Sequence, residues 1–349
     1  MPRPIDSVVV PAARTADHLG PAGRLAAELG AQCVALCSRE ARAGAVVERV
    51  DAAVEAIDLP LDYHHPLLEL TTSRAVELTS SRLGDLSTKR NLALLLARLA
   101  GWRTVLFLDD DIVEVRPDTV RSASRYLGAA TAVGFPVTDF PDNSVVCHAR
   151  RLAGECQDVF VSGSALLVDT ARVRSFFPRI YNEDWLFLLD DVWSGRVVRA
   201  DPVRQLPYDP FADAGRAENE EFGELIAEGL MQLTRCARGD RRSVLQAAGD
   251  ERWWRHARYC READVGRTAA LIDQQRGRRE GSDVLRALAA AGRRRDAIAA
   301  SALAAYVRAW RSDRRRWAAR IEDIPTVGSF RLALQWLGLV SHTRLSNVS

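Results

Sequence analysis

In the first half of the chain, short continuous apolar runs alternate with longer segments in which apolar residues recur every three or four positions. Four apolar runs have the length and β-branched content of buried strands: 7–10, 32–37, 52–57 and 104–108. Apolar side chains at three- and four-residue spacing predict helices in the intervening segments 19–29, 41–50 and 87–101. Strands that alternate with helices predict an α/β fold with a mostly parallel sheet.

The pattern changes in the last third of the chain. After a further helix at 117–126 and a strand at 132–136, the sequence becomes almost entirely helical from about residue 238. Leu, Ala and Trp recur there at helical spacing with Arg between them, which predicts an α-helical bundle or a long hairpin. We therefore expect an α/β domain at residues 1–235 and an α-helical domain at residues 236–349.

Three consecutive carboxylates follow the strand at 104–108. Ser87 is a suitable N-cap for the helix before that strand. We expect Asp109, Asp110 and Asp111 at the carboxyl edge of the sheet, where open α/β sheets bind ligands. Adjacent carboxylates repel one another, and a divalent cation such as Mg²⁺ or Mn²⁺ would offset their charge. The alternative is a solvated turn rich in Asp.

Three polar residues, Lys89, Arg90 and Asn91, would then lie in the first turn of the helix. Lys89 is the one lysine in a chain whose 48 Lys+Arg residues are otherwise arginine. Free backbone N–H groups and the helix dipole attract anions at a helix start. Ammonium, guanidinium and amide donors there suit a phosphate or diphosphate. The alternative is an ordinary basic turn in contact with solvent.

A second acidic group lies about 70 residues further on, at Asn182, Glu183 and Asp184. Bulky apolar side chains follow it at once, and apolar surroundings raise the pKa of a carboxylate toward that of a general base. The alternative is a capping pair at the start of a buried helix, with Asn182 as the cap.

Two further segments are candidates for the walls of a site. Residues 142–154 are polar and irregular in pattern, which predicts a loop. His148 in this loop has the chemistry to ligate a metal or accept a proton, and a packing role is the alternative. Residues 207–230 begin as a Pro-rich loop and become an acidic amphipathic helix. That helix either covers the ligand site or presents its charges to solvent.

The strand that ends in Asp109, Asp110 and Asp111, together with the acidic pair downstream, resembles the donor-binding core of GT-A nucleotide-sugar glycosyltransferases, in particular their family-two-like branch. The resemblance covers roughly residues 5–235. It implies a GT-A (Rossmann-like) fold, a mostly parallel sheet flanked by helices, followed here by the α-helical C-terminal region. It also implies that Asp109 and Asp111 hold a Mg²⁺ or Mn²⁺ ion that bridges the donor diphosphate.

The same resemblance implies roles for the other candidate residues. The loop after the first strand contacts the nucleotide in this family. The residues that would bind the donor are Arg14, Lys89, Arg90, Asn91, Asp109 and Asp110. A small-residue loop that would line the donor sugar and the acceptor consists of Ser162, Gly163 and Ser164. Asp184 would supply the base that deprotonates the acceptor hydroxyl, with Glu183 as its neighbour.

We therefore expect an enzyme that moves a sugar from a UDP- or GDP-linked donor to an acceptor hydroxyl, with inversion slightly favoured over retention. A haloacid-dehalogenase-type phosphatase is the first alternative, with Asp109 as nucleophile, because its first motif also follows a hydrophobic strand. A non-catalytic protein that binds nucleotides or nucleic acid is the second. The chain lacks the G-x-G-x-x-G fingerprint and the P-loop, which argues against a dinucleotide enzyme and a Walker ATPase.

Charge and cysteine content refine the expected partners and location. Residues 235–331 contain 23 Arg and 12 Asp+Glu, a net charge of +11, so the rest of the chain carries −9 of the total of +2. The basic helices contain no base-reading motif, so we expect no nucleic-acid partner and at most weak contact with a membrane surface. The six cysteines form no C-x-x-C pair, which is typical of a reduced, cytoplasmic protein. No uncharged apolar window is long enough to span a membrane.

Overall fold

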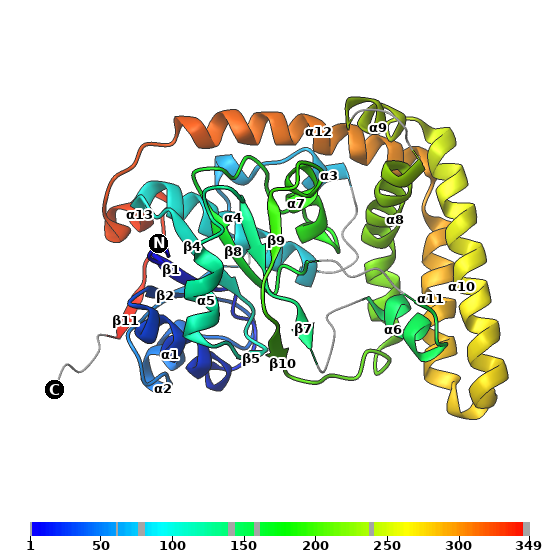
Figure 1. The fold of residues 1–349 in the computed structure, drawn as a ribbon, viewed down its shortest axis with the longest axis horizontal. Helices are drawn as coiled ribbons and strands as arrows, with labels where there is room; N and C mark the ends of the chain where they lie inside the picture. The colour runs from blue at the N-terminus through cyan, green and yellow to red at the C-terminus, as the bar shows by residue number, and fades with distance from the viewer. Residues whose placement is uncertain are drawn as a thin grey trace.

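A twisted sheet carries helices on both faces, and a group of long helices stands beside it (Figure 1). The computed structural model describes residues 2–60, 62–75, 81–138, 144–156, 161–236 and 241–344. The eight strands of the main sheet lie in the order β11 (His342–Arg344), β3 (Val54–Asp58), β2 (Gln32–Cys37), β1 (Ser7–Val10), β4 (Thr104–Leu108), β8 (Ala165–Asp169), β6 (Ala132–Gly134) and β9 (Val197–Arg199).

The sheet is mostly parallel, which confirms the α/β prediction. β1 runs parallel to both β2 and β4, β2 is parallel to β3, and β6 is parallel to β9. β8 is antiparallel to its neighbours β4 and β6, and β11 is antiparallel to β3. β11 comes from the end of the described chain and covers the edge of β3, a pairing between segments far apart in sequence that no local pattern predicts.

Helices bury both faces of the sheet. α1 (Gly20–Leu29), α2 (Ala43–Arg49) and α5 (Pro117–Ser124) pack on one face, and α4 (Ser81–Ala100) and α7 (Glu183–Trp193) pack on the other. Successive side chains of a strand point to opposite faces. Val8 and Val10 of β1 accordingly join the cluster around α1 and α2, whereas Val9 joins the cluster around α4 and α7.

A small second sheet begins at the carboxyl edge of the main sheet. It has the strand order β5 (Ile112–Glu114), β10 (Val203–Gln205) and β7 (Val137–Thr138). The remaining short helices in the first part of the chain are η1 (Ala16–Leu19), η2 (Pro66–Leu68) and α3 (Thr72–Ala75). β5 begins directly after the three carboxylates, so the second sheet starts at the edge where the first one ends.

The later helices are α6 (Val145–Leu152), α8 (Ala214–Cys236), α9 (Arg241–Ala247), α10 (Glu251–Glu280), α11 (Ser282–Ala297), α12 (Ala300–Asp323) and α13 (Phe330–Trp336). α8, α10 and α11 stand together at one end of the molecule, and α12 crosses back over the α/β part (Figure 1). Among the helices of the described ranges, none has an apolar stretch that could cross a bilayer.

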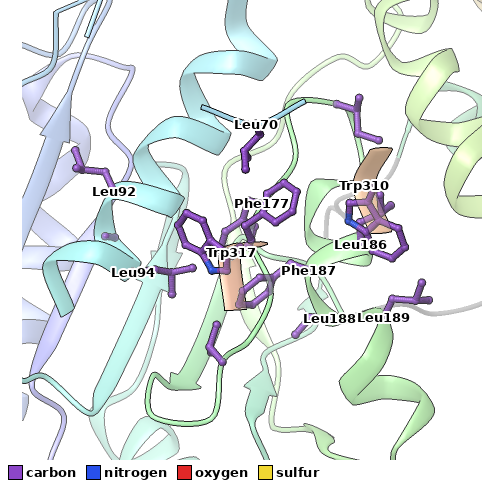
Figure 2. Close-up of a cluster of buried hydrophobic side chains, with 14 of the residues drawn as sticks. Leu70, Leu92, Leu94, Phe177, Leu186, Phe187, Leu188, Leu189, Trp310 and Trp317 are labelled. Atoms are coloured by element: carbon purple, nitrogen blue, oxygen red, sulfur yellow. The ribbon is translucent and has the colours of Figure 1, made fainter. Parts of the chain in front are cut away.

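The C-terminal helices share a hydrophobic core with the α/β part. Trp310 and Trp317 of α12 lie in one buried cluster with Phe177, with Phe187 of α7 and with Leu94 of α4 (Figure 2). The rings of Phe177 and Phe187 stack with their centroids 3.9 Å apart. The predicted division into domains 1–235 and 236–349 stays a prediction, and the chain crosses that boundary at the end of α8.

Two local predictions were wrong. The helix predicted to begin at Ser87 begins at Ser81, because the segment 81–86, with Leu83 and Leu86 at helical spacing, continues the helix toward its N-terminus. Lys89 and its neighbours therefore lie in mid-helix, away from the free N–H groups of a helix start. The segment 142–154, predicted as a loop, contains α6, capped by the Ser144 side chain, which accepts a hydrogen bond from the Cys147 amide. Asp142 and Asn143 lie outside the described residues.

Candidate functional site

A cavity of about 990 Å³ opens at the carboxyl edge of the sheet, between the α/β part and the helices α6 and α8. The chain runs outward from β1 through β2 to β3 and then returns to β4 on the other side of β1. Open α/β sheets bind ligands in the crevice at such a reversal of strand order. Arg14, after β1, and Asp109, after β4, both line the cavity, so its position agrees with this rule.

Arg90 joins the two acidic groups that the sequence singled out. Its Nη2 donates to both carboxylate oxygens of Asp109, at 2.8 and 3.0 Å, and its Nη1 donates to Glu183. The Arg90 side chain is buried, and the carboxylates of Asp109 and Glu183 raise its pKa against the opposing effect of burial. Arg90 thus holds the end of β4 against the start of α7. Its predicted contact with a donor stays a prediction.

The next two carboxylates bind a second arginine. Nη1 of Arg14 donates to Asp110, and Nη2 donates to Asp111 Oδ2 at 2.9 Å. The backbone amides of Ala13 and Arg14 donate to Asp110 Oδ2 at 2.7 and 2.8 Å. Burial lowers the pKa of Arg14, but the charges of Asp111 and Asp110 outweigh it and raise the pKa overall. The structure therefore brings Arg14 to the carboxylates, and its predicted contact with a donor stays a prediction.

Gln205 is a site residue that the sequence did not reveal. Its Nε2 donates to Asp111 Oδ2 at 3.0 Å, and within the described part of the chain its buried Oε1 has no hydrogen-bond partner. Gln205 ends β10 in the second sheet and lies 94 residues after Asp111. A lone glutamine at the end of a three-residue strand carries no sequence signal for a role of this kind.

Asp184 holds the small-residue loop. Its Oδ2 accepts a hydrogen bond of 2.6 Å from the Gly163 amide, and its Oδ1 accepts one of 2.8 Å from the Trp185 amide. A Cβ atom at Gly163 would lie 2.7 Å from Arg90 Nη1 and 2.9 Å from the Cβ of Asp184, so this close approach requires glycine. The carbonyl of Ser164 accepts from the Asp109 amide at 2.8 Å, which ties the loop to the end of β4.

Glu183 is buried beside the charges of Arg90 and Asp184. Burial raises the pKa of Glu183 to about 8, Arg90 opposes that shift and Asp184 adds to it. Asn182 does not cap α7 through its side chain, contrary to the capping alternative. It adopts a left-handed backbone with φ 62° and donates through Nδ2 to Glu224 Oε1 at 2.8 Å. α8 therefore fixes the turn from which Glu183 and Asp184 project.

Lys89 and Asn91 are bound within the protein. Lys89 Nζ donates to the Ala12 carbonyl at 2.7 Å, to Ser38 Oγ at 2.6 Å and to Asp85 at 3.0 Å, which uses its three N–H groups. Burial lowers the pKa of Lys89, although Asp85 opposes the shift. Asn91 exchanges two hydrogen bonds with the backbone of residue 177 and does not line the cavity. Their predicted donor-binding roles stay predictions, and their contacts hold β1, β2 and α4 together.

Lys89→Met is expected to lower the free energy of unfolding by about 3 kcal/mol, because it removes the cation from a buried pair and leaves Asp85 beside unsatisfied acceptors. Urea denaturation measures the change. The control is Arg49→Met, which breaks an exposed pair with Asp17 and is expected to leave the midpoint near that of wild type. A Lys89→Met midpoint equal to that of the control would contradict a structural role for the lysine.

The helical wall of the cavity contains a second polar network. Tyr208 Oη lies 3.1 Å from His148 Nε2 and accepts a hydrogen bond of 3.1 Å from Arg216 Nη2. Arg216 also donates to Glu220 at 2.7 Å, and Glu220 accepts from the Val145 amide at the start of α6. Burial raises the pKa of Glu220 to about 7. His148 is thus part of a buried network on α6, not of an open loop.

The cavity is acidic overall, which favours a cationic ligand. Among the described residues that line it, 13 are acidic and seven are basic. No group of three or more His, Cys, Asp and Glu in the described ranges has the arrangement of a metal site. A Mg²⁺ ion, however, commonly takes only one or two protein carboxylates and completes its shell with water and phosphate. Asp110 and Asp111 already hold one cation, the Arg14 guanidinium, and their carboxylate oxygens are of the ligand type that Mg²⁺ prefers, so the chemistry of these residues suits such an ion.

Two of the predicted site residues, Asn91 and His148, do not line this cavity. The others gather around it, with Gly163 immediately behind its wall. Neither a protein-family model nor a curated protein sequence matches the chain. Function is therefore inferred from the chemistry of the cavity and its position in the fold.

Proposed function

We propose that the protein is a metal-dependent glycosyltransferase of GT-A type, which moves a sugar from a nucleoside-diphosphate donor to an acceptor hydroxyl. One observation carries the proposal. Asp109, Asp110 and Asp111 at the end of β4 and Asp184 at the start of α7 line the same cavity, at the reversal of strand order. A volume of about 990 Å³ is at the upper end for small-molecule sites and suits a large donor with its acceptor.

The acidic excess of the cavity supports a divalent cation as part of donor binding. A diphosphate is an anion, and around the end of β4 the carboxylates of Asp109, Asp110, Asp111 and Asp184 outnumber the guanidinium groups of Arg14 and Arg90. They repel a diphosphate unless another cation is added. Asp111, with Asp109 or Asp110 beside it, would hold Mg²⁺ or Mn²⁺. When bound, this ion would stabilise the charge of the departing nucleoside diphosphate.

Asp184 would accept the proton of the acceptor hydroxyl as that oxygen attacks the anomeric carbon. The amides of Gly163 and Trp185 fix its carboxylate, so the base is oriented before the substrate binds. Arg90 would fix the position of the base relative to the donor-binding carboxylates, because it binds both Asp109 and Glu183, the neighbour of Asp184. Attack from the face opposite the leaving group would invert the anomeric carbon.

Thermal shift with UDP, GDP and their common sugar conjugates tests the donor class. One nucleotide is expected to raise the melting temperature by about 5 °C at about 100 times its dissociation constant, and to do so only with Mn²⁺. Asp111→Asn is expected to abolish the shift. The matched control is Asp118→Asn, which makes the same change at an exposed position on α5 and should keep the full shift.

Absence of a shift with every nucleotide would contradict the glycosyltransferase. Stabilisation by beryllofluoride, a mimic of an aspartyl phosphate, that is lost in Asp109→Asn would favour the phosphatase alternative instead. A shift that persists in Asp111→Asn would support nucleotide binding but would contradict Asp111 as a ligand of the metal ion.

A further inference from the structure

Arg14 is the cation that lies against Asp110 and Asp111. Its guanidinium donates to both carboxylates, and its side chain is 34% exposed. The side chains of Asp110 and Asp111 are 5% and 11% exposed. Asp110 and Asp111 are therefore fixed by burial, whereas the guanidinium has solvent beside it and is the partner that can leave.

Both carboxylates keep hydrogen-bond donors when the guanidinium moves away. Asp110 Oδ2 still accepts from the backbone amides of Ala13 and Arg14, at 2.7 and 2.8 Å. Asp111 Oδ2 still accepts from Gln205 Nε2 at 3.0 Å. A buried carboxylate without any hydrogen-bond donor would be costly. Movement of the Arg14 side chain does not incur this cost, because both carboxylates keep a donor. The backbone of the loop after β1 can stay in place.

A divalent cation and this guanidinium compete for the same charges. Arg14 Nη2 lies 2.9 Å from Asp111 Oδ2, so a cation bound to Asp111 would be its immediate neighbour. Like charges at such separations repel strongly even where the surroundings are polar. A diphosphate in the cavity offers the displaced guanidinium an anion that arginine binds through two N–H groups.

We propose that Arg14 is the resident counter-cation of Asp110 and Asp111, and that it transfers to the donor's diphosphate when a divalent cation takes its place. The diphosphate as destination rests on the proposed function, whereas the exchange of cations does not. Two effects of opposite sign follow. Removal of the guanidinium strengthens binding of the metal alone and weakens binding of a nucleoside diphosphate in the presence of the metal.

Two binding measurements on Arg14→Asn test the proposal. The affinity of the nucleotide-free protein for Mn²⁺, from the EPR signal of free Mn²⁺, is expected to rise at least about tenfold. The affinity for UDP or GDP at saturating Mn²⁺, from calorimetry, is expected to fall about tenfold. Arg14→Lys keeps one charge without the fork that bridges two carboxylates, and an intermediate Mn²⁺ affinity is expected. Thermal melting without ligands checks the fold, and Arg14→Gln replaces a variant that does not fold.

Arg39→Asn is the matched control. Arg39 lines the same cavity, its side chain is also 34% exposed, and its ion pair is with Asp85 at 3.6 Å. Its φ of 58° is tolerated by asparagine, so the substitution adds little backbone strain. Its Mn²⁺ affinity is expected to stay within about threefold of wild type, because its ion pair is with Asp85, outside the three carboxylates at the end of β4.

The two measurements separate failure of the exchange from failure of the donor. A Mn²⁺ affinity that does not rise in Arg14→Asn, or that rises equally in Arg39→Asn, overturns the exchange whatever nucleotides do. An unchanged UDP or GDP affinity in Arg14→Asn overturns the proposed movement of Arg14 to the diphosphate. When wild type binds neither UDP nor GDP, the proposed donor fails, and the Mn²⁺ titration alone still decides the exchange.

Discussion

Arg261→Met is expected to lower the free energy of unfolding by about 5 kcal/mol, the upper end for the loss of one partner from a buried ion pair. Arg261 of α10 is 2% exposed. Its guanidinium donates to Glu221 at 2.9 and 3.1 Å and to Glu228 at 2.7 Å, and it lies 3.2 Å from Glu224. Methionine fills much of the same space but leaves three carboxylates without their cation. Urea denaturation at pH 7 measures the loss.

The effect of Arg261→Met is expected to grow with pH. Burial already raises the pKa of Glu228 to about 7, and it raises the pKa of Glu221 as well. Without Arg261, both pKa values rise further. The folded variant then keeps protons that the unfolded chain, with a glutamate pKa of about 4.3, has released, so its free energy of unfolding falls as pH rises through this window. The variant should lie closer to wild type at about pH 5 than at about pH 8.

Arg252→Met provides the comparison on the same helix. Arg252 is exposed and pairs with the exposed Asp250, so its loss is expected to leave the denaturation midpoint unchanged. Arg261→Lys keeps a charge without the forked geometry and should fall between wild type and Arg261→Met. An Arg261→Met midpoint equal to that of Arg252→Met would mean that the three glutamates do not need their arginine.

The surroundings of Arg261 show why the helical wall could not be predicted from the sequence. Glu221, Glu224 and Glu228 recur on one side of α8 at three- and four-residue spacing, which is also the pattern of a solvated acidic face. Their partner lies 33 to 40 residues later, on another helix. The period of charges along one helix does not tell whether a second helix covers them.

The candidate site divides in the same way between local and distant features. The strand at 104–108 and its carboxylates were predictable, because apolar run, length and turn residues all lie in one short stretch. The contacts of those carboxylates were not. Arg14 and Asp110 are 96 residues apart, and only the parallel pairing of β1 with β4 brings them together.

Asp184→Asn is expected to reduce kcat for sugar transfer by about 10³-fold, within the range for loss of a general base. Asparagine keeps an oxygen that can accept from the Gly163 amide, so the loop at 162–164 should hold its position. The amide cannot take a proton from the acceptor. Donor KM is expected to change little, because the change removes proton transfer and not a donor contact. Release of the nucleoside diphosphate, with water or a hydroxyl compound as acceptor, gives both constants.

Two further variants show whether a loss of activity in Asp184→Asn comes from loss of the base. Asp191→Asn makes the same change on the same helix, away from the cavity, and should retain most of the activity. Glu183→Gln removes the charge that pairs with Arg90 but keeps an oxygen that can accept from it, so it should reduce kcat far less than Asp184→Asn. An Asp184→Asn enzyme with a third or more of the wild-type kcat would exclude Asp184 as the base. A large loss in Glu183→Gln instead would move the proton transfer to the carboxyl that Arg90 holds.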